Sequence, residues 1–388
     1  MRITIVNGFF LPVPPVGGGS TEKTWYNLGR LFAARGHKVL SLSRSWPGFP
    51  DEESLAGVRH LRLPGYSHSA KLGRNLVRDF MWSWRVFRSL PQADFVICNA
   101  VTLPIWLGRL KPSAGRVVVM CGRMPKGQYR HYSRLARILA PSEVVREHVL
   151  TENPALEPVI RTIGYPIDWS LLASDDGTAP PFLSPRRESD GVAIGFIGRL
   201  HHEKGLMLLA EALRLLRAEP GLPPWQVMLC GPSDTARGGS GAEFRNRLLS
   251  SLSKAVDNTR LHLLEPQFNE RVLASIYRRI DVFCYPSLAE EGETFGVAVA
   301  EAMAAGALPV VSGLRCFAGL VRDGANGLVF DHTASDAAHR LATALRRTIV
   351  DAELRKRLAI QARQDVRQYD FPLYADRLLA DFATLSGG

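Results

Sequence analysis

The sequence predicts an α/β protein built from two doubly wound parallel sheets that face one another across a cleft. The chain has 388 residues, which is more than a single hydrophobic core usually organises. Short apolar runs alternate with amphipathic helical segments in both halves, as expected when helices connect parallel strands. A segment rich in Pro, Ser, Asp and Gly, residues 171–190, separates the two halves and predicts a linker.

The first domain is expected at residues 1–170. Its opening strand, ITIVNG, is followed by a Gly-rich loop and by an amphipathic helix, TEKTWYNLGRLFAARG, that ends at Gly36. The apolar runs FVICNA, RVVVMCG and ILAPS predict further strands.

The second domain is expected at residues 191–365 and repeats the same order. VAIGFIG predicts its first strand, RLHHEKG a loop and LMLLAEALRLLRAE a helix, while WQVMLCG, LHLLEP, DVFCYPS and LPVVSG predict later strands. Residues 366–388 contain an amphipathic helical segment. It is either an ordinary terminal helix or a helix that crosses back to the first domain. In folds of this kind ligands bind at the carboxyl ends of the strands.

The composition predicts a soluble cytoplasmic protein. Hydrophobic residues make up 46% and charged residues 22% of the chain, as in globular domains, and no apolar run is long enough to span a membrane. The start, MRITIVNGFF, is too short an apolar stretch for a secretory signal. The five cysteines include no Cys-x-x-Cys pair and are expected to be buried thiols in a reducing compartment.

Positive charge is concentrated in the first half. The whole chain carries +11, whereas residues 1–170 hold 23 basic against 11 acidic residues, a net +12. The first domain is therefore expected to meet an anionic partner. A nucleic acid is disfavoured, because no nucleic-acid motif is present and the aromatic residues do not alternate with the basic ones on a strand-like face.

Two Gly-rich loops are candidates for phosphate binding. GGGSTEKT, residues 17–24, places Glu22 where a P-loop has Gly before Lys23, which argues against a nucleotide triphosphatase. FIGRLHHEKG places Arg199 and Lys204 at the mouth of the following helix, where the helix amides already favour an anion. A solvated basic loop is the alternative.

A second candidate anion site precedes the helix in EEGETFGVAVAEAMAAG. The amides of Thr294, Phe295 and Gly296 are expected at its start, near Phe295. Glu293 lies just before this helix and Glu301 about two turns along it. Carboxylates accept hydrogen bonds from sugar hydroxyls, so the pair could hold a sugar and a ribose on opposite sides of a diphosphate. The alternative is a helix-dipole contact for Glu293 and a solvent-facing Glu301.

The second half resembles the nucleotide-binding domain of family 4 retaining glycosyltransferases, which have the GT-B fold of two Rossmann-like domains. The matching motifs occur in the family's order: GRLHHEKG, LCGPSD, YPSLAEEGETFGVAVAEAMAAGALPVV and DGANGLVF. The first half is similar more loosely, through GGGSTEKTWYNLGRLFAARGHKV and the APS of residues 140–142.

The resemblance implies transfer of a sugar from a nucleotide-diphosphate sugar on the second domain to an acceptor on the first, with no cofactor. It places Arg199 and Lys204 on the donor diphosphate, Glu293 on the donor sugar and Glu301 on the ribose. These first three are the expected catalytic residues. The complete expected donor site is Gly18, Gly19, Gly198, Arg199, Lys204, Gly231, Glu293, Thr294, Phe295, Gly296 and Glu301.

One departure from the family concerns the strand RVVVMCG, which in the family often ends in a His near the donor sugar. Here Cys121 stands at that end, and a thiol is a weak hydrogen-bond partner. No Asp-x-Asp pair is placed to hold a metal against a diphosphate. We therefore expect metal-independent transfer, in which cations and helix amides stabilise the leaving diphosphate.

Two basic segments of the first half could meet an anionic acceptor, either a saccharide or a lipid-linked one. In the run Arg123, Lys126, Arg130, Arg134 and Arg137, part is expected to face the cleft, with Arg123, Lys126, Arg130 and His131 as acceptor-binding residues. A solvated helix face is the alternative.

AKLGRNLVRDFMWSWRVFRSL, residues 70–90, read as a helix has Leu76, Phe80, Trp84 and Phe87 on one face, Lys71, Arg74, Arg78 and Arg85 beside it, and Trp82 at the boundary. This pattern suits a helix in peripheral contact with an anionic membrane. An ordinary crossover helix packed on the sheet is the favoured alternative.

Other GT-B chemistry remains open, namely a sugar phosphorylase or a nucleotide-sugar epimerase. A nucleic-acid-binding protein is the non-catalytic alternative, disfavoured as described above.

Overall fold

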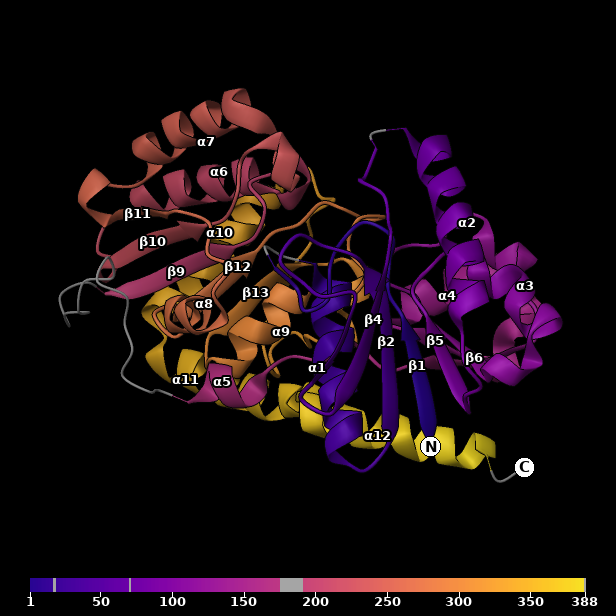
Figure 1. Ribbon diagram of the computed structural model, residues 1–388. Coiled ribbons are helices and arrows are strands. Elements are labelled where there is room, and N and C mark those ends of the chain that lie inside the picture. The colour runs from indigo at the N-terminus through magenta and orange to yellow at the C-terminus, as the bar shows by residue number, and fades with distance from the viewer. Residues whose placement is uncertain (17–18, 70, 175–190, 387–388) are drawn as a thin grey trace. The chain divides into compact units, whose positions relative to one another are not determined.

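The computed structural model describes residues 1–16, 19–69, 71–174 and 191–386, and these form two compact units (Figure 1). The first unit contains residues 1–166 together with helix α12 (Phe371–Ser386). The second unit is Ile167–Asp370. The chain thus leaves the first unit, builds the second and returns.

The first unit alternates strands with helices. Its elements in order are β1 (Arg2–Val6), α1 (Ser20–Ala34), β2 (Lys38–Arg44), β3 (Glu52–Leu55), β4 (Val58–Leu63), α2 (Leu72–Ser89), β5 (Phe95–Cys98), α3 (Leu103–Leu110), β6 (Arg116–Met120), β7 (Leu135–Ala140), α4 (Glu143–Glu152) and β8 (Ile160–Thr162), followed at the end of the chain by α12.

The strands of this unit form one sheet in the order β3-β4-β2-β1-β5-β6-β7-β8. All neighbouring pairs are parallel except β3 with β4. The central strand β5 is completely buried, as expected for a parallel strand covered on both faces. Helix α1 packs against α12, while α2 packs against α3.

Helix α12 is tied to this unit by polar and aromatic contacts. Asp381 accepts two hydrogen bonds from the Arg137 guanidinium, at 2.6 and 2.7 Å. The Tyr374 hydroxyl donates to the Gly164 carbonyl at 3.1 Å, and the Phe382 ring stacks on Phe95 with centroids 4.6 Å apart. These contacts explain why the last helix belongs to the first unit.

The second unit has the same alternation. Its elements are α5 (Trp169–Ala173), β9 (Val192–Ile197), α6 (Leu206–Arg217), β10 (Trp225–Cys230), α7 (Gly241–Ala255), β11 (Leu261–Leu264), α8 (Glu270–Tyr277), β12 (Val282–Tyr285), α9 (Val297–Ala304), β13 (Leu308–Ser312), β14 (Leu328–Phe330), α10 (Ala337–Val350) and α11 (Ala352–Val366).

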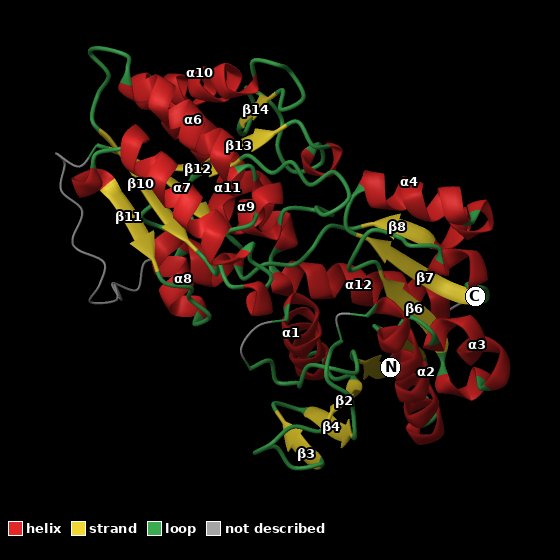
Figure 2. Cartoon of the chain, turned by 90° about the horizontal axis from the view of Figure 1, so that it is seen from above, coloured by secondary structure: helices red, strands yellow, loops and turns green. Residues whose placement is uncertain are grey.

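The sheet of the second unit has the order β11-β10-β9-β12-β13-β14, and all of its neighbouring pairs are parallel. Helix α6 packs between α7 and α10, whereas α9 packs against α5 and α11, and helices flank this sheet in the second view (Figure 2). The predicted α/β class with two doubly wound parallel sheets is confirmed.

Only the first four residues of the expected linker, 171–174, lie in the described part of the chain. Residues 171–173 belong to helix α5, which begins at Trp169 behind the Asp168 side chain that accepts from the Leu171 amide at 2.9 Å. Residues 175–190 lie outside the described part of the chain. None of the described helices combines the length and apolar composition needed to cross a bilayer.

Candidate functional site

The strand order of the second unit indicates where a ligand would bind. Starting from β9, the chain adds β10 and β11 on one side and then β12, β13 and β14 on the other. The direction of winding therefore reverses between β9 and β12, and in sheets of this order ligands bind beyond the carboxyl ends of the two strands at the reversal. The segment after β9 carries Arg199 and Lys204, and the segment after β12 carries Glu293.

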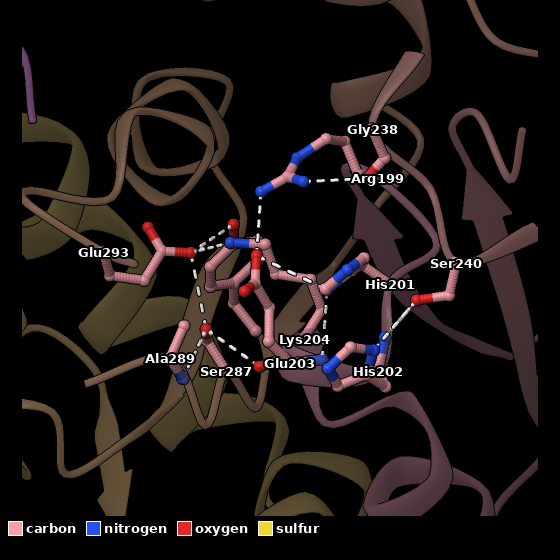
Figure 3. Close-up of polar contacts among 11 residues, drawn as sticks. Arg199, His201, His202, Glu203, Lys204, Gly238, Ser240, Ser287, Ala289 and Glu293 are labelled. Carbon is pink, nitrogen blue, oxygen red and sulfur yellow. Dashed lines mark hydrogen bonds and ion pairs between the residues drawn. The ribbon is translucent and has the colours of Figure 1, made fainter. Parts of the chain in front are cut away.

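The structure joins Lys204 and Glu293 in a buried ion pair (Figure 3). Only 5% of Lys204 and 7% of Glu293 are exposed. The Lys204 ammonium contacts Oε1 of Glu293, and the same oxygen accepts from the hydroxyls of Tyr285 at 2.9 Å and Ser287 at 3.4 Å. The ammonium also lies 5.5 Å from the centre of the Tyr285 ring.

The hydrogen bonds from Tyr285 and Ser287 and the contact with the ammonium all converge on one carboxylate oxygen of Glu293. Among the described residues, Oε2 of Glu293 has no hydrogen-bond donor, and in Figure 3 it points away from the cluster. A carboxylate oxygen held in this way can accept from a ligand hydroxyl. Burial, followed by the negative charge of Glu293, raises the pKa of Tyr285 well above its ordinary value, so this tyrosine remains a hydrogen-bond donor.

Arg199 is held beside this pair by two protein acceptors. Its guanidinium donates to Glu203 at 2.8 Å and to the Gly238 carbonyl at 2.7 Å. Burial lowers the pKa of His201, which lies 3.5 Å from the same Glu203 carboxylate. The adjacent His202 contacts Ser240 Oγ at 3.0 Å. The loop therefore presents two fixed cations and a neutral imidazole near neutral pH.

Close backbone approaches explain two glycines near this site, one after β10 and one before α6. A Cβ on Gly231, after β10, would lie 1.8 Å from the Gly198 carbonyl oxygen. A Cβ on Gly205, at the start of α6, would lie 1.9 Å from the Pro286 carbonyl oxygen. Any larger residue would push apart the segments that follow β9, β10 and β12.

The helix expected near Phe295 begins two residues later. Gly296 has φ 93 and precedes the first helical residue, Val297, because a left-handed residue cannot be part of the helix itself. The Gly296 carbonyl accepts from Val299 and Ala300, at 2.9 and 3.0 Å. Thr294 and Phe295 thus belong to the preceding turn, and the Phe295 ring packs edge-on against Tyr369 with centroids 5.1 Å apart.

Glu301 lies on α9 and has a different neighbour from Glu293. Its Oε2 accepts from the Tyr277 hydroxyl of α8 at 2.9 Å. Burial, followed by the charge of Glu301, raises the pKa of Tyr277 well above its ordinary value. Glu301 is half-buried and hydrogen-bonded, which does not fit the alternative of a mid-helix Glu facing solvent.

The remaining expected site residues lie in the first unit. Gly19 precedes α1 and its carbonyl accepts from the Lys23 amide at 2.9 Å, whereas Gly18 lies outside the described residues. The expected acceptor residues lie together in the segment after β6, whose turn is pinned by Glu152 through the amides of Gly127 and Tyr129. These exposed residues are Arg123, Lys126, Arg130 and His131.

Arg137, the last residue of the basic run, does not belong to this exposed segment. It lies on β7, is buried and pairs with Asp381 of α12, so its charge is neutralised within the protein. Only part of the run was expected to face the cleft, and the pairing of Arg137 could not be predicted because its partner is distant in sequence and β7 turns this side chain inward.

Cys121, which stands where the family often has His, is also committed to a protein contact. Its Sγ lies 2.7 Å from the Tyr129 hydroxyl, and the thiol is buried. Burial raises its pKa to about 12, so this cysteine is neither a thiolate nor a nucleophile at neutral pH.

Sequence reasoning did not assign roles to Tyr285, Ser287, Glu203 and Tyr277. The first two stand in the motif YPSLAEEGETFG, so the motif contained the signal, but their contact with Glu293 depends on how the turn after β12 folds back. Glu203 is adjacent to Lys204 in sequence and holds Arg199. Tyr277 is 24 positions from Glu301 and left no recognisable pattern.

This arrangement can bind a polar, anionic ligand. Two cations and an available carboxylate oxygen lie at the carboxyl ends of β9 and β12, and a half-buried carboxylate lies on α9. Within the described ranges, no group of three or more His, Cys, Asp or Glu side chains is placed to hold a metal ion.

The region that contains this site is similar to a known protein family. Residues 184–365 match the family model described as "Glycosyl transferases group 1". This region is therefore similar to group 1 glycosyl transferases. All the donor-site residues expected in the second unit fall within the matched region.

Similarity to curated proteins extends beyond this region in one relative. A phosphatidyl-myo-inositol mannosyltransferase of Mycobacterium leprae is 29% identical over 100% of this chain and 97% of its own length. The homologue of that name from Mycolicibacterium smegmatis is also 29% identical, over 51% of this chain and 46% of its length. This chain therefore spans about half the length of several curated relatives that it matches.

Solved structures show the fold. Sucrose-phosphate synthase from Thermosynechococcus elongatus has a TM-score of 0.77 at 21% identity, covering 100% of this chain and 99% of that chain. The expected GT-B fold of two Rossmann-like units is confirmed.

Proposed function

We propose that this protein transfers a hexosyl group from a nucleotide-diphosphate sugar to a hydroxyl of an acceptor, with retention of the anomeric configuration. The observation that carries the proposal is the buried Lys204–Glu293 pair, with Arg199 beside it, at the point where the sheet of the second unit reverses its winding. That site offers cations for a diphosphate and a carboxylate oxygen for a sugar hydroxyl.

Each donor group has a partner in this proposal. Lys204 and Arg199 bind the diphosphate, and Oε2 of Glu293 accepts from a hydroxyl of the transferred sugar. Glu301, oriented by the Tyr277 hydroxyl, binds the ribose. The loop glycines Gly198 and Gly231 allow the backbone to approach the ligand, and the turn Thr294 to Gly296 contributes amides to the donor site.

The reaction needs no covalent intermediate with the protein. The bond between the anomeric carbon and the diphosphate oxygen breaks, and the acceptor oxygen forms a bond to that carbon on the same face. The acceptor proton passes to the departing diphosphate. Lys204 and Arg199 stabilise the charge that develops on the diphosphate, where fixed cations contribute most. They take the role that a metal ion has in other transferases, so we propose that transfer is metal-independent.

The acceptor is proposed to be an anionic saccharide or a lipid-linked one. Arg123, Lys126, Arg130 and His131 are exposed in one segment of the first unit, and within the described residues their charged ends have no hydrogen bond or ion pair with the protein. The relatives named above act, by their names, on phosphatidyl-myo-inositol, which is both anionic and lipid-linked. The reaction would take place on the cytoplasmic face of a membrane, in glycolipid or polysaccharide synthesis.

Product analysis tests this function. The purified chain is incubated with a mixture of nucleotide sugars, with and without extracted lipid or saccharide acceptors, and products are identified by mass spectrometry and by the NMR coupling of the new anomeric proton. We expect a glycosylated acceptor with retained configuration, formed equally well in EDTA. Phosphate-dependent release of sugar phosphate would instead identify a phosphorylase, and a changed sugar without acceptor would identify an epimerase.

A variant pair makes the assignment specific. Lys204→Ala should lower turnover about 10²-fold or more, by analogy with removal of one transition-state donor, while binding of the nucleotide diphosphate falls less. Lys254→Ala, an exposed lysine of α7 in the same unit, is the control and should leave turnover unchanged. Equal turnover in Lys204→Ala and the parent would exclude Lys204 from the reaction.

A further inference from the structure

Helix α2 is turned so that its polar contacts face the protein. The buried Asp79 carboxylate accepts from the amides of Val101 and Thr102, at 3.1 and 2.8 Å, and from the Thr102 hydroxyl at 2.7 Å. Trp82 is fully buried, rather than at the boundary as the sequence indicated, and its Nε1 donates to the Asn7 carbonyl at 3.0 Å. These contacts fix which face of α2 is directed outward.

The outward face of α2 is apolar. Six of its side chains are between 43% and 67% exposed: Leu72, Leu76, Val77, Phe80, Met81 and Trp84. At about 100° per residue, those from Leu76 to Met81 cover an arc of roughly 140°. Single exposed apolar residues are common, but a contiguous strip of this kind marks a binding surface. The alternative of an ordinary crossover helix with its apolar face against the sheet is therefore wrong.

Basic residues border this strip on one side. At the same angular increment, Arg88, Arg74, Arg85 and Arg78 fall in the arc next to Met81, and the only acidic residue of the helix, Asp79, is buried. Lys71, Arg74 and Arg88 are exposed, and their charged ends have no hydrogen bond or ion pair within the described residues. The surface thus combines apolar side chains with uncompensated positive charge.

A hollow of about 620 Å³ lies at the carboxyl-terminal half of this surface. It is lined by Tyr66, Phe80, Met81 and Trp84 together with Arg85 and Arg88. The Trp84 ring stacks on Phe87 with centroids 5.7 Å apart and lies 6.2 Å from Trp106 of α3. Aromatic rings beside arginines are typical of side chains that lie at the level of lipid headgroups.

We propose that this face of α2 docks on an anionic lipid bilayer. The helix lies in the plane of the membrane, the strip from Leu72 to Trp84 enters the boundary between headgroups and acyl chains, and the arginines contact lipid phosphates. The hollow receives part of one lipid. This proposal concerns a surface of the first unit and does not depend on the reaction proposed above.

The positive charge of this surface favours an anionic bilayer over a second copy of this chain as the binding partner. A twofold contact brings the same surface of both copies together, and here it would face one set of basic residues with another set. A soluble anion would satisfy the arginines but leave the apolar strip in water. An anionic bilayer matches both features, because it offers phosphates above an apolar layer.

Vesicle sedimentation with the full chain and without donor tests this docking. We expect binding to vesicles of phosphatidylglycerol and phosphatidylcholine at low salt, release at high salt, and no binding to phosphatidylcholine alone. Each basic contact near an anionic surface is worth about fivefold in binding, so Arg74→Gln/Arg88→Gln should weaken it about 25-fold. Phe80→Ser/Trp84→Ser should weaken it at least as strongly, because the apolar strip is interrupted.

Matched controls lie in the second unit. Arg357→Gln/Ile360→Ser changes one exposed arginine and one half-exposed isoleucine of α11 and should bind as the parent does. Lys204→Ala should also bind normally, so loss of transfer and loss of docking are distinguished. Trp84→Phe keeps the fold and should remove most of the tryptophan quenching by brominated lipid.

Three results would overturn the proposal. The first is failure of the parent to sediment with anionic vesicles at low salt. The second is binding that the α2 variants leave unchanged. The third is a parent dimer in solution that Phe80→Ser/Trp84→Ser converts to a monomer, which would assign the face to a second copy of the chain.

Discussion

Replacement of Lys204 by methionine tests how strongly the buried ion pair holds the candidate site together. Methionine keeps much of the side-chain volume but removes the cation. The Glu293 carboxylate, which is only 7% exposed, would then stay buried without a counter-ion and keep only its two hydroxyl donors. Removing one partner of a buried pair typically costs about 3–5 kcal/mol, because the other charge stays buried. For a unit of about 200 residues this lowers the midpoint of unfolding by roughly 6–20 °C.

The double variant Lys204→Met/Glu293→Gln separates the charge effect from packing. It removes both charges while the glutamine can still accept from Tyr285 and Ser287, so we expect recovery of most of the lost stability. Replacing a buried pair by neutral residues is often close to neutral. Lys254→Met, an exposed change in the same unit, should leave the unfolding temperature within about 1 °C of the parent.

Differential scanning calorimetry of the parent, the two Lys204 variants and the Lys254→Met control measures these differences in unfolding temperature. A Lys204→Met protein that unfolds at the parent temperature would refute the reasoning, since a buried carboxylate cannot lose its cation without cost. A double variant no more stable than Lys204→Met would show that the loss came from packing and not from charge. Repeating the scans with UDP, GDP or ADP reports which nucleotide the site prefers, as an upward shift.

Three further predictions concern other residues. Glu301→Ala should weaken binding of nucleotide and nucleotide sugar together, because a ribose contact is present in ground and transition states alike; unchanged affinity in a calorimetric titration would remove Glu301 from the site. Burial, with a smaller effect from Arg62, lowers the pKa of His60 from 6.5 to about 4, so its neutral form is favoured in the folded state. The stabilisation from the neutral form of His60 should be fully present above pH 6.5, and the free energy of unfolding should fall by up to about 3 kcal/mol as the pH decreases to about 4. In urea unfolding, His60→Phe should reduce this decrease of the free energy with falling pH. A variant whose free energy of unfolding falls with pH as steeply as that of the parent would contradict the prediction. The five cysteines are buried, so Ellman's reagent should label none in the native protein and all five after denaturation, and rapid labelling of the native chain would show an accessible thiol.

The candidate site was predictable from sequence as far as local spacing specifies it. Arg199 and Lys204 stand in one loop and Glu293 in a turn before a helix, so their residue types and positions indicated an anion and hydroxyl site. Their convergence required the parallel pairing of β9 with β12, which no local pattern reveals. The hydroxyl donors Tyr285 and Ser287 were missed for the same reason, because their roles depend on the path of the turn after β12.

The amphipathic pattern of α2 was visible in the sequence, but its orientation was not. An apolar stripe predicts burial unless something else fixes the helix. Here Asp79 accepts from backbone amides of the β5–α3 turn, and Trp82 donates to the carbonyl of the residue that follows β1. Arg137 illustrates the converse: it belongs to a basic run of which part was expected to face the cleft, yet Asp381, 244 positions away, pairs with it inside the first unit. Both outcomes depend on contacts distant in sequence.

The return of α12 to the first unit affects the order in which the protein can be completed during synthesis. Residues 167–370 leave the ribosome as an entire unit, whereas the first unit still lacks one helix at that moment. Until residues 371–386 emerge, Arg137 has no carboxylate partner and the Phe95 ring lacks the aromatic cover of Phe382. Although domains usually finish folding in the order in which they are made, here the unit that begins first finishes last. The second unit is in effect an insertion near the end of the first, and a fragment cut at the linker is not a domain.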